Sequence, residues 1–147
     1  QKDKGKDNFL LSPGGVPGIQ SRIALIYTFG VRTGILSLQQ WVSACSTAPA
    51  QIFGLAPRKG SLAVGSDADI VLFDPEKRVK LTKSLLQERV DYTPYEGFEL
   101  LGYPRATFLN GRLVVEEDRL VDSQPRGQFV KRNRHETPDI ERLTDEY

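Results

Sequence analysis

The sequence has 147 residues, with 20 Lys and Arg residues against 19 Asp and Glu residues and a formal net charge of +1. A nearly neutral chain has no overall field that attracts nucleic acid or an anionic membrane, so neither partner is expected. Its apolar runs are too short to span a bilayer, and its single cysteine cannot form an internal disulfide. We therefore expect a soluble, cytoplasmic protein. The chain contains no Met and opens on the polar Gln1, so we expect a piece of a longer protein.

The first third of the chain is predicted to be a loop followed by three helices. Glycines and prolines are frequent in residues 1–19, which disfavours a helix or a central strand there. Apolar residues then recur at helical spacing over residues 20–29 and 38–46, and a short helix is expected over residues 50–53. The second helix has one apolar face, formed by Leu38, Trp41, Val42 and Cys45. Trp41 is therefore expected to be a core residue.

Capping signals accompany these helices. Ser37 and Gln40 have the spacing of a capping box, in which each side chain bonds the backbone N–H of the other residue. Gly30 and Gly54 are expected to end their helices, and Pro49 suits the first turn of the short helix.

Beyond residue 60 the pattern becomes that of strands. The apolar run 69–73 predicts a buried strand, and a shorter strand piece is expected near residues 79–81. Asn110 and Gly111 separate the segments 105–109 and 112–116. Because Asn-Gly tolerates the positive φ angles of a type I′ turn, these two segments are predicted to form a β-hairpin.

The usual catalytic constellations are missing, so no catalytic or metal-binding residue is expected in this chain. The single histidine, His135, lies in a polar tail and cannot build a zinc site alone. Cys45 has no histidine near it in the sequence, which disfavours a nucleophilic role. Asp67, Asp69 and Asp74 do not have the spacing of a calcium loop. They are interpreted as turn-forming residues.

The candidate binding residues are Pro13, Gly14 and Gly15, in a glycine-rich stretch near the start of the chain. Glycines let backbone N–H and C=O groups approach a ligand closely, because no Cβ intervenes. Their spacing matches neither a nucleotide P-loop nor a dinucleotide fingerprint. Contact with a ligand and simple turn geometry are equally compatible with this composition.

Four stretches carry a resemblance to a known family. Residues 58–71, Arg-Lys-Gly-Ser-Leu-Ala-Val-Gly-Ser-Asp-Ala-Asp-Ile-Val, resemble the segment by which amidohydrolase-superfamily chains leave the barrel and enter a small β-sandwich. Residues 8–19, 47–55 and 92–98 are similar to the substrate loop, the post-barrel helix and the sandwich-return loop of dihydropyrimidinases and D-hydantoinases. The resemblance covers roughly residues 5–132.

The resemblance implies an α/β fold, the C-terminal fragment of a (β/α)₈ TIM barrel joined to strands of a small β-sandwich. Residues 1–57 would be the end of the barrel with its substrate loop, and residues 58–120 would belong to the sandwich. Residues 121–147 would form a tail that packs on a neighbouring subunit of a homotetramer.

The resemblance also implies a hydrolase of pyrimidine catabolism that cleaves a C–N bond of dihydropyrimidine or hydantoin rings. Two zinc ions would act in it, with ligands upstream of Gln1, so this chain alone would be inactive. The small cyclic amide or imide would contact backbone groups of Pro13, Gly14 and Gly15, although the family loop commonly has asparagine where this chain has Gly14. A non-catalytic dihydropyrimidinase-related binding protein and an allantoinase-like hydrolase are the alternatives. The Tyr-Glu-Gly-Phe stretch at residues 95–98 favours dihydropyrimidinase over allantoinase.

Overall fold

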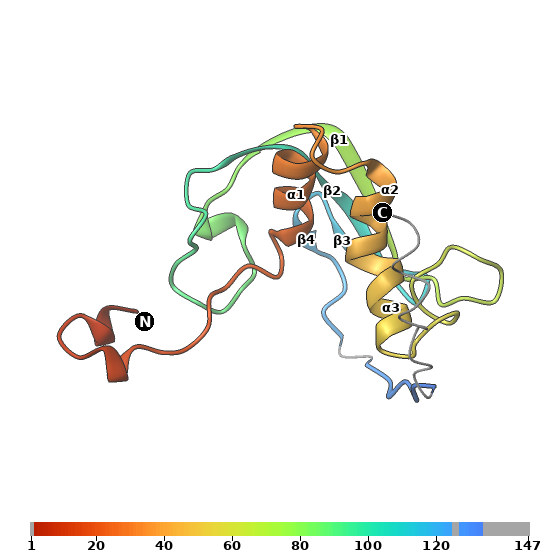
Figure 1. Ribbon diagram of the computed structural model, residues 1–147, viewed down its shortest axis with the longest axis horizontal. Coiled ribbons are helices and arrows are strands. Elements are labelled where there is room, and N and C mark those ends of the chain that lie inside the picture. Colours follow the sequence, from red (N-terminus) through yellow and green to blue (C-terminus); the bar gives the residue numbers. More distant parts are fainter. Residues whose placement is uncertain (1, 125–126, 134–147) are drawn as a thin grey trace, which may run out of the picture.

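A computed structural model describes residues 2–124 and 127–133 of the protein. Helices precede a four-stranded sheet of order β1-β2-β3-β4, in which every neighbouring pair is antiparallel. Figure 1 shows the N-terminal segment extending away from the helices and the sheet. The elements are α1 (Arg22–Ile26), α2 (Leu38–Val42), α3 (Ala48–Ile52), β1 (Ile70–Lys80), β2 (Glu99–Leu109), β3 (Arg112–Glu116) and β4 (Arg119–Leu120). Short 3₁₀ turns lie at Lys2–Gly5, Phe9–Leu11 and Lys83–Leu85.

The helical region consists of two continuous runs, so the prediction of three separate helices is wrong. α2 passes through a π-helical turn, Ser43–Thr47, directly into α3. The reason is Pro49, which has no N–H to donate and whose ring would collide with the carbonyl four residues earlier in a regular α-helix. The wider π turn, closed by the Ala48 N–H on the Ser43 carbonyl, accommodates it. The capping box of Ser37 and Gln40 is confirmed, with both bonds present.

The first helical run starts and ends later than predicted. It begins at Arg22, and a π-helical turn, Tyr27–Val31, extends α1 past the expected end at residue 29. Gly30 therefore lies inside the run instead of ending it. The next glycine, Gly34, has a φ of +78°, a conformation typical of the residue that follows a helix.

The hairpin prediction is confirmed. Leu109 pairs with Arg112, and the two residues between them, Asn110 and Gly111, have φ angles of +49° and +76°. These are the positive angles that a type I′ turn requires at both central positions.

β1 is longer and less buried than predicted. It runs unbroken over the two strand pieces expected separately, and its pairing with β2 is irregular between Asp74 and Arg78. Pro75 lies in this stretch and cannot donate to a ladder, whereas the Asp74 carboxylate accepts the N–H groups of Glu76 and Lys77 at 2.9 and 3.2 Å. The prediction of a buried strand is wrong, and β1 is an edge strand among the described residues. Val71, which lines an open cavity, and Leu72, on the other face of the strand, are 42% and 50% exposed.

Aromatic side chains connect the helices to the sheet. Trp41 is 8% exposed, as predicted for a core residue. Its ring centroid lies 5.2 Å from that of Tyr27 and 5.0 Å from that of Phe73, and Tyr27 and Phe73 are 4.7 Å apart. The indole N–H donates to the Ile23 carbonyl at 3.3 Å. Such tilted and edge-on aromatic contacts add to the burial energy of the rings. Val42 and Cys45, predicted on the same apolar face as Trp41, are less buried than predicted because they line a cavity between the helices and β1. Leu38, the fourth residue of that face, is 52% exposed.

A second buried cluster lies between α1 and β2. Its members are Ala24, Leu81, Leu86, Leu100 and Tyr103. The Thr28 hydroxyl adds a polar link, because it donates to the Leu101 carbonyl and accepts the Leu101 N–H, both at 3.2 Å. The helices therefore have a defined position on the sheet.

The last described segment folds back onto the turn after α3. The N–H of Asn133 donates to the carbonyl of Gly54 at 2.7 Å. Gly54 has a φ of +66°, which confirms its predicted place at the end of the helix. The expectation about His135 concerns a residue outside the described part of the chain.

Candidate functional site

The candidate loop of Pro13, Gly14 and Gly15 lies on the extended N-terminal segment, and all three residues are exposed. The Lys2 ammonium group donates to the carbonyl of Gly15 at 2.9 Å and also to that of Pro13. This lysine, for which the sequence offered no signal, joins the two ends of the loop. Gly15 has a φ of +76°, a conformation that glycine adopts readily.

The loop presents unused backbone donors. The N–H groups of Gly14 and Gly15 make no hydrogen bond with any other described residue. A Cβ placed on either glycine would have no other atom within 4 Å, so the approach to both is open. An amide N–H can donate to the carbonyl oxygen of a ligand such as a cyclic amide, and the loop could therefore orient such a ring without any charged side chain.

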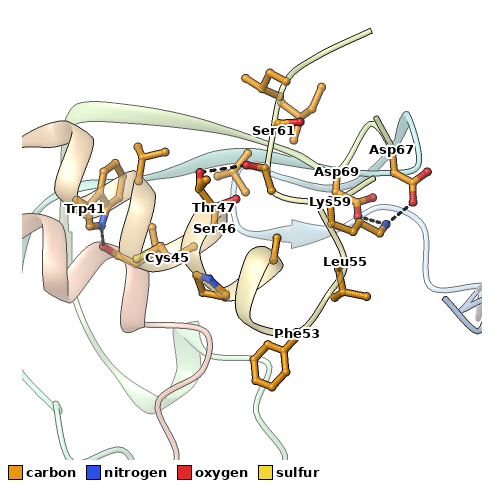
Figure 2. Close-up of a pocket in the computed structure, with 18 of the residues that line it drawn as sticks. Trp41, Cys45, Ser46, Thr47, Phe53, Leu55, Lys59, Ser61, Asp67 and Asp69 are labelled. Atoms are coloured by element: carbon orange, nitrogen blue, oxygen red, sulfur yellow. Dashed lines mark hydrogen bonds and ion pairs between the residues drawn. The ribbon is translucent and has the colours of Figure 1, made fainter. Parts of the chain in front are cut away.

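A separate cavity of about 820 Å³ lies between the helices and β1. α2 and α3 form one wall, and β1 with the loop before it forms the other. Figure 2 shows Trp41, Cys45 and Phe53 on the helical side and Lys59 at the far rim. None of the three candidate loop residues lines this cavity. The structure does not bring the two features together.

The charged rim of the cavity is an internally satisfied ion-pair network. The Lys59 ammonium lies 2.8 Å from Asp67 and also contacts Asp69, while the Arg58 guanidinium lies 2.9 Å from Asp67. Asp69 in turn accepts the backbone N–H of Asn110 at 2.9 Å. Through this bond the loop before β1 is held to the β2–β3 turn, which gives the aspartates a structural role.

The pKa values of these groups agree with such a role. Burial alone would lower the pKa of Lys59, but the hydrogen bonds that its ammonium donates to Asp67 and Asp69 raise it above its ordinary value. The hydrogen bonds from Lys59 and Arg58 lower the pKa of Asp67. Both groups are therefore held in their charged forms, with no tendency to exchange a proton near neutral pH.

Cys45 lines the cavity as a neutral thiol. Burial raises its pKa, and the nearby positive charge of Arg22 offsets only part of this rise. The thiolate is the nucleophilic form of cysteine, so a raised pKa disfavours nucleophilic chemistry here.

The described residues do not fit a zinc centre. Among residues 2–124 and 127–133, no three His, Cys, Asp or Glu side chains converge on a common point. A structural zinc site has four ligands and a catalytic one at least three. In the same part of the chain, none of the helices has the length and apolar character to cross a membrane.

Comparison with known proteins assigns the chain to a family. The sequence model of the amidohydrolase family matches residues 18–114. The chain belongs to the amidohydrolase family. Among its relatives, the D-hydantoinase of Rhizobium radiobacter is 42% identical over 91% of this chain and 29% of its own length. The D-hydantoinase of Ralstonia pickettii is 40% identical over the same shares of both chains.

Solved structures of amidohydrolases confirm the predicted fold class. The crystal structure of dihydropyrimidinase from Brevibacillus agri matches 94% of this chain with a TM-score of 0.89 and 39% identity, over 30% of its own length. This amidohydrolase chain thus spans less than a third of the relatives it matches. The resemblance to dihydropyrimidinases and D-hydantoinases is confirmed.

Proposed function

We propose that this amidohydrolase chain is the substrate-positioning part of a cyclic amide hydrolase that opens hydantoin or dihydropyrimidine rings. The observation that carries the proposal is the 42% identity to a D-hydantoinase over 91% of the chain. The loop of Pro13, Gly14 and Gly15 is consistent with it. Its exposed N–H groups are donors of the kind that a ring carbonyl accepts.

In this proposal, substrate positioning belongs to this chain and metal binding belongs to residues outside its described part. The family resemblance implies two zinc ions, which would activate the attacking water. Their ligands would have to come from outside the described residues, because no metal-ligating cluster exists among these. What this chain supplies is orientation, since backbone donors at fixed positions hold a planar ring in one register.

The domain boundaries are part of the same proposal. Residues 1–57 would be the end of the barrel, residues 58–120 the sandwich part and residues 121–147 a tail on a neighbouring subunit of a cytoplasmic homotetramer. Phe129, which is 93% exposed, offers an apolar side chain for such a contact.

The test uses the longest natural protein that contains this chain, assayed for ring opening of hydantoin and of dihydrouracil. Gly14→Pro removes the N–H donor, whereas Gly14→Ala keeps it and adds a methyl group where no other atom lies within 4 Å. We expect Gly14→Pro to lower kcat/KM about fivefold, the factor for one hydrogen bond worth about 1 kcal/mol. Gly14→Ala should stay close to wild type.

The two parts of the proposal fail separately. Absence of ring opening with both substrates would contradict the hydrolase. Equal kcat/KM for Gly14→Pro and Gly14→Ala in an active enzyme would contradict the role of the loop.

A further inference from the structure

Two hydrogen bonds connect the end of the substrate loop to the segment between β1 and β2, and no local sequence pattern predicts them. The backbone N–H of Gln20 donates to Oε1 of Glu88 at 3.2 Å. In return the backbone N–H of Gln87 donates to Oε1 of the Gln20 side chain at 2.7 Å. We call these two bonds the Gln20–Glu88 clamp.

The clamp lies close to the loop along the chain. Only residues 16–19 separate Gly15 from Gln20, and Pro17 among them has a fixed φ. Gly18 packs against the Tyr95 ring, so a Cβ there would come within 3.3 Å of it. The Gly18 carbonyl accepts the N–H of Arg22 and so begins α1. The connection between Gln20 and Gly15 is therefore short and held at Gly18.

The Glu88 side of the clamp is itself anchored. The Lys83 ammonium donates to the carbonyls of Leu86 and Glu88 at 3.2 and 2.9 Å, which closes the turn that carries the glutamate. Leu86 belongs to the buried cluster between α1 and β2. The clamp thus joins the loop to a packed region.

Stability alone does not account for the polar groups at this place. Oε2 of Glu88 is buried and has no hydrogen-bond partner among the described residues. The neighbouring Tyr103 is 3% exposed, and burial followed by the Asp118 carboxylate raises its pKa, while a hydrogen bond with the Gln20 side chain offsets part of this rise. Unpaired buried polar atoms cost stability, and an apolar side chain would avoid that cost. A glutamate at position 88 is understandable if its carboxylate has a positioning task.

We propose that Gln20 and Glu88 are positioning residues that fix the substrate loop of Pro13, Gly14 and Gly15 relative to the sheet. The positioning role rests on the proposed function, whereas the hydrogen bonds of the clamp do not depend on it. The clamp fixes the position of the Gly14 and Gly15 N–H groups, and these groups orient the substrate ring.

The first experiment needs no activity and uses the chain labelled with ¹⁵N. Glu88→Ala removes the acceptor of the Gln20 N–H, and Glu88→Gln keeps an oxygen in the same place. Arg89→Ala is the control, since Arg89 is the exposed neighbour of Glu88. In Glu88→Ala we expect the Gln20 amide to exchange with solvent about fivefold faster. The order parameters of the Gly14 and Gly15 amides should fall, while Glu88→Gln and Arg89→Ala should match wild type.

The second experiment measures kinetics in the longest natural protein that contains the chain. Glu88→Ala should raise KM about fivefold with little change in kcat, and Glu88→Gln should restore KM. Unchanged loop order parameters in Glu88→Ala would overturn the proposal, whatever the activity. So would a Glu88→Gln variant as impaired as Glu88→Ala, or a KM that responds equally to Arg89→Ala. If the protein opens neither ring, the proposed hydrolase fails while the order parameters still decide the positioning role.

Discussion

Replacement of Gly102 by alanine should destabilise the protein strongly. Gly102 lies in β2 with a φ of +97°, which is strained for any residue with a Cβ. A Cβ there would overlap the Tyr27 ring and lie 2.9 Å from Cε1 of Phe73. Backbone strain costs about 1–3 kcal/mol, and an extra methyl group in a packed core costs about 1–3 kcal/mol more. We therefore expect Gly102→Ala to lower the free energy of unfolding by about 2–6 kcal/mol.

Gly97→Ala separates the two contributions. Gly97 has a similar φ of +84°, but a Cβ there would have no other atom within 4 Å. Gly97→Ala should therefore lower the free energy of unfolding only by the cost of backbone strain, about 1–3 kcal/mol. Urea unfolding followed by the fluorescence of Trp41, the single tryptophan, measures both variants. If Gly102→Ala loses no more stability than Gly97→Ala, the overlap with Tyr27 does not determine the cost.

Two further predictions concern the loop before β1 and the last described segment. Hydrogen bonds from Lys59 and Arg58 lower the pKa of Asp67 in the folded state. These contacts therefore stabilise the fold above the unfolded-state pKa of about 4, and the stabilisation is lost as the pH falls through the folded-state pKa of Asp67. When the pH is lowered below about 4, the urea midpoint should therefore decrease less in Asp67→Asn than in wild type. An equal decrease in both proteins would contradict this. Gly54→Ala should release the segment around Asn133, because its Cβ would overlap the Asn133 carbonyl. Peptides covering residues 127–133 should then exchange hydrogen faster, whereas Gly65→Ala, with a φ of +93° and no other atom within 4 Å of its Cβ, should leave them unchanged.

Local signals were sufficient for some of the features that depend on neighbours in the sequence. The capping box of Ser37 and Gln40 spans one helical turn, and the turn at Asn110 and Gly111 depends on the φ angles of those two residues. Such features depend on short-range sterics and hydrogen bonding, which a single sequence displays directly. Trp41 was identified by helical periodicity for the same reason.

Features that depend on distant residues could not be predicted in this way. The exposure of Val71 depends on how closely the helices pack over that face of β1, and this packing is not contained in a local pattern. The clamp joins Gln20 to Glu88 across 68 positions, and nothing near either residue indicates the other. The π turn before Pro49 was within reach of sequence reasoning, since proline disrupts an α-helix, but the same residue is also compatible with a new helix start.

Stability and substrate positioning are carried by different residues of this amidohydrolase chain. Gly102 and Tyr27 meet inside the packed contact between helix and sheet. The clamp, by contrast, lies where the N-terminal segment joins α1, and it includes Oε2 of Glu88, a buried oxygen that a purely structural contact would not need. A perturbation of the sheet should therefore change the free energy of unfolding and leave KM nearly constant. A perturbation of the clamp should do the reverse. Measuring both quantities for Gly102→Ala and Glu88→Ala would reveal whether the two tasks are separable, because coupled tasks would change both quantities in each variant.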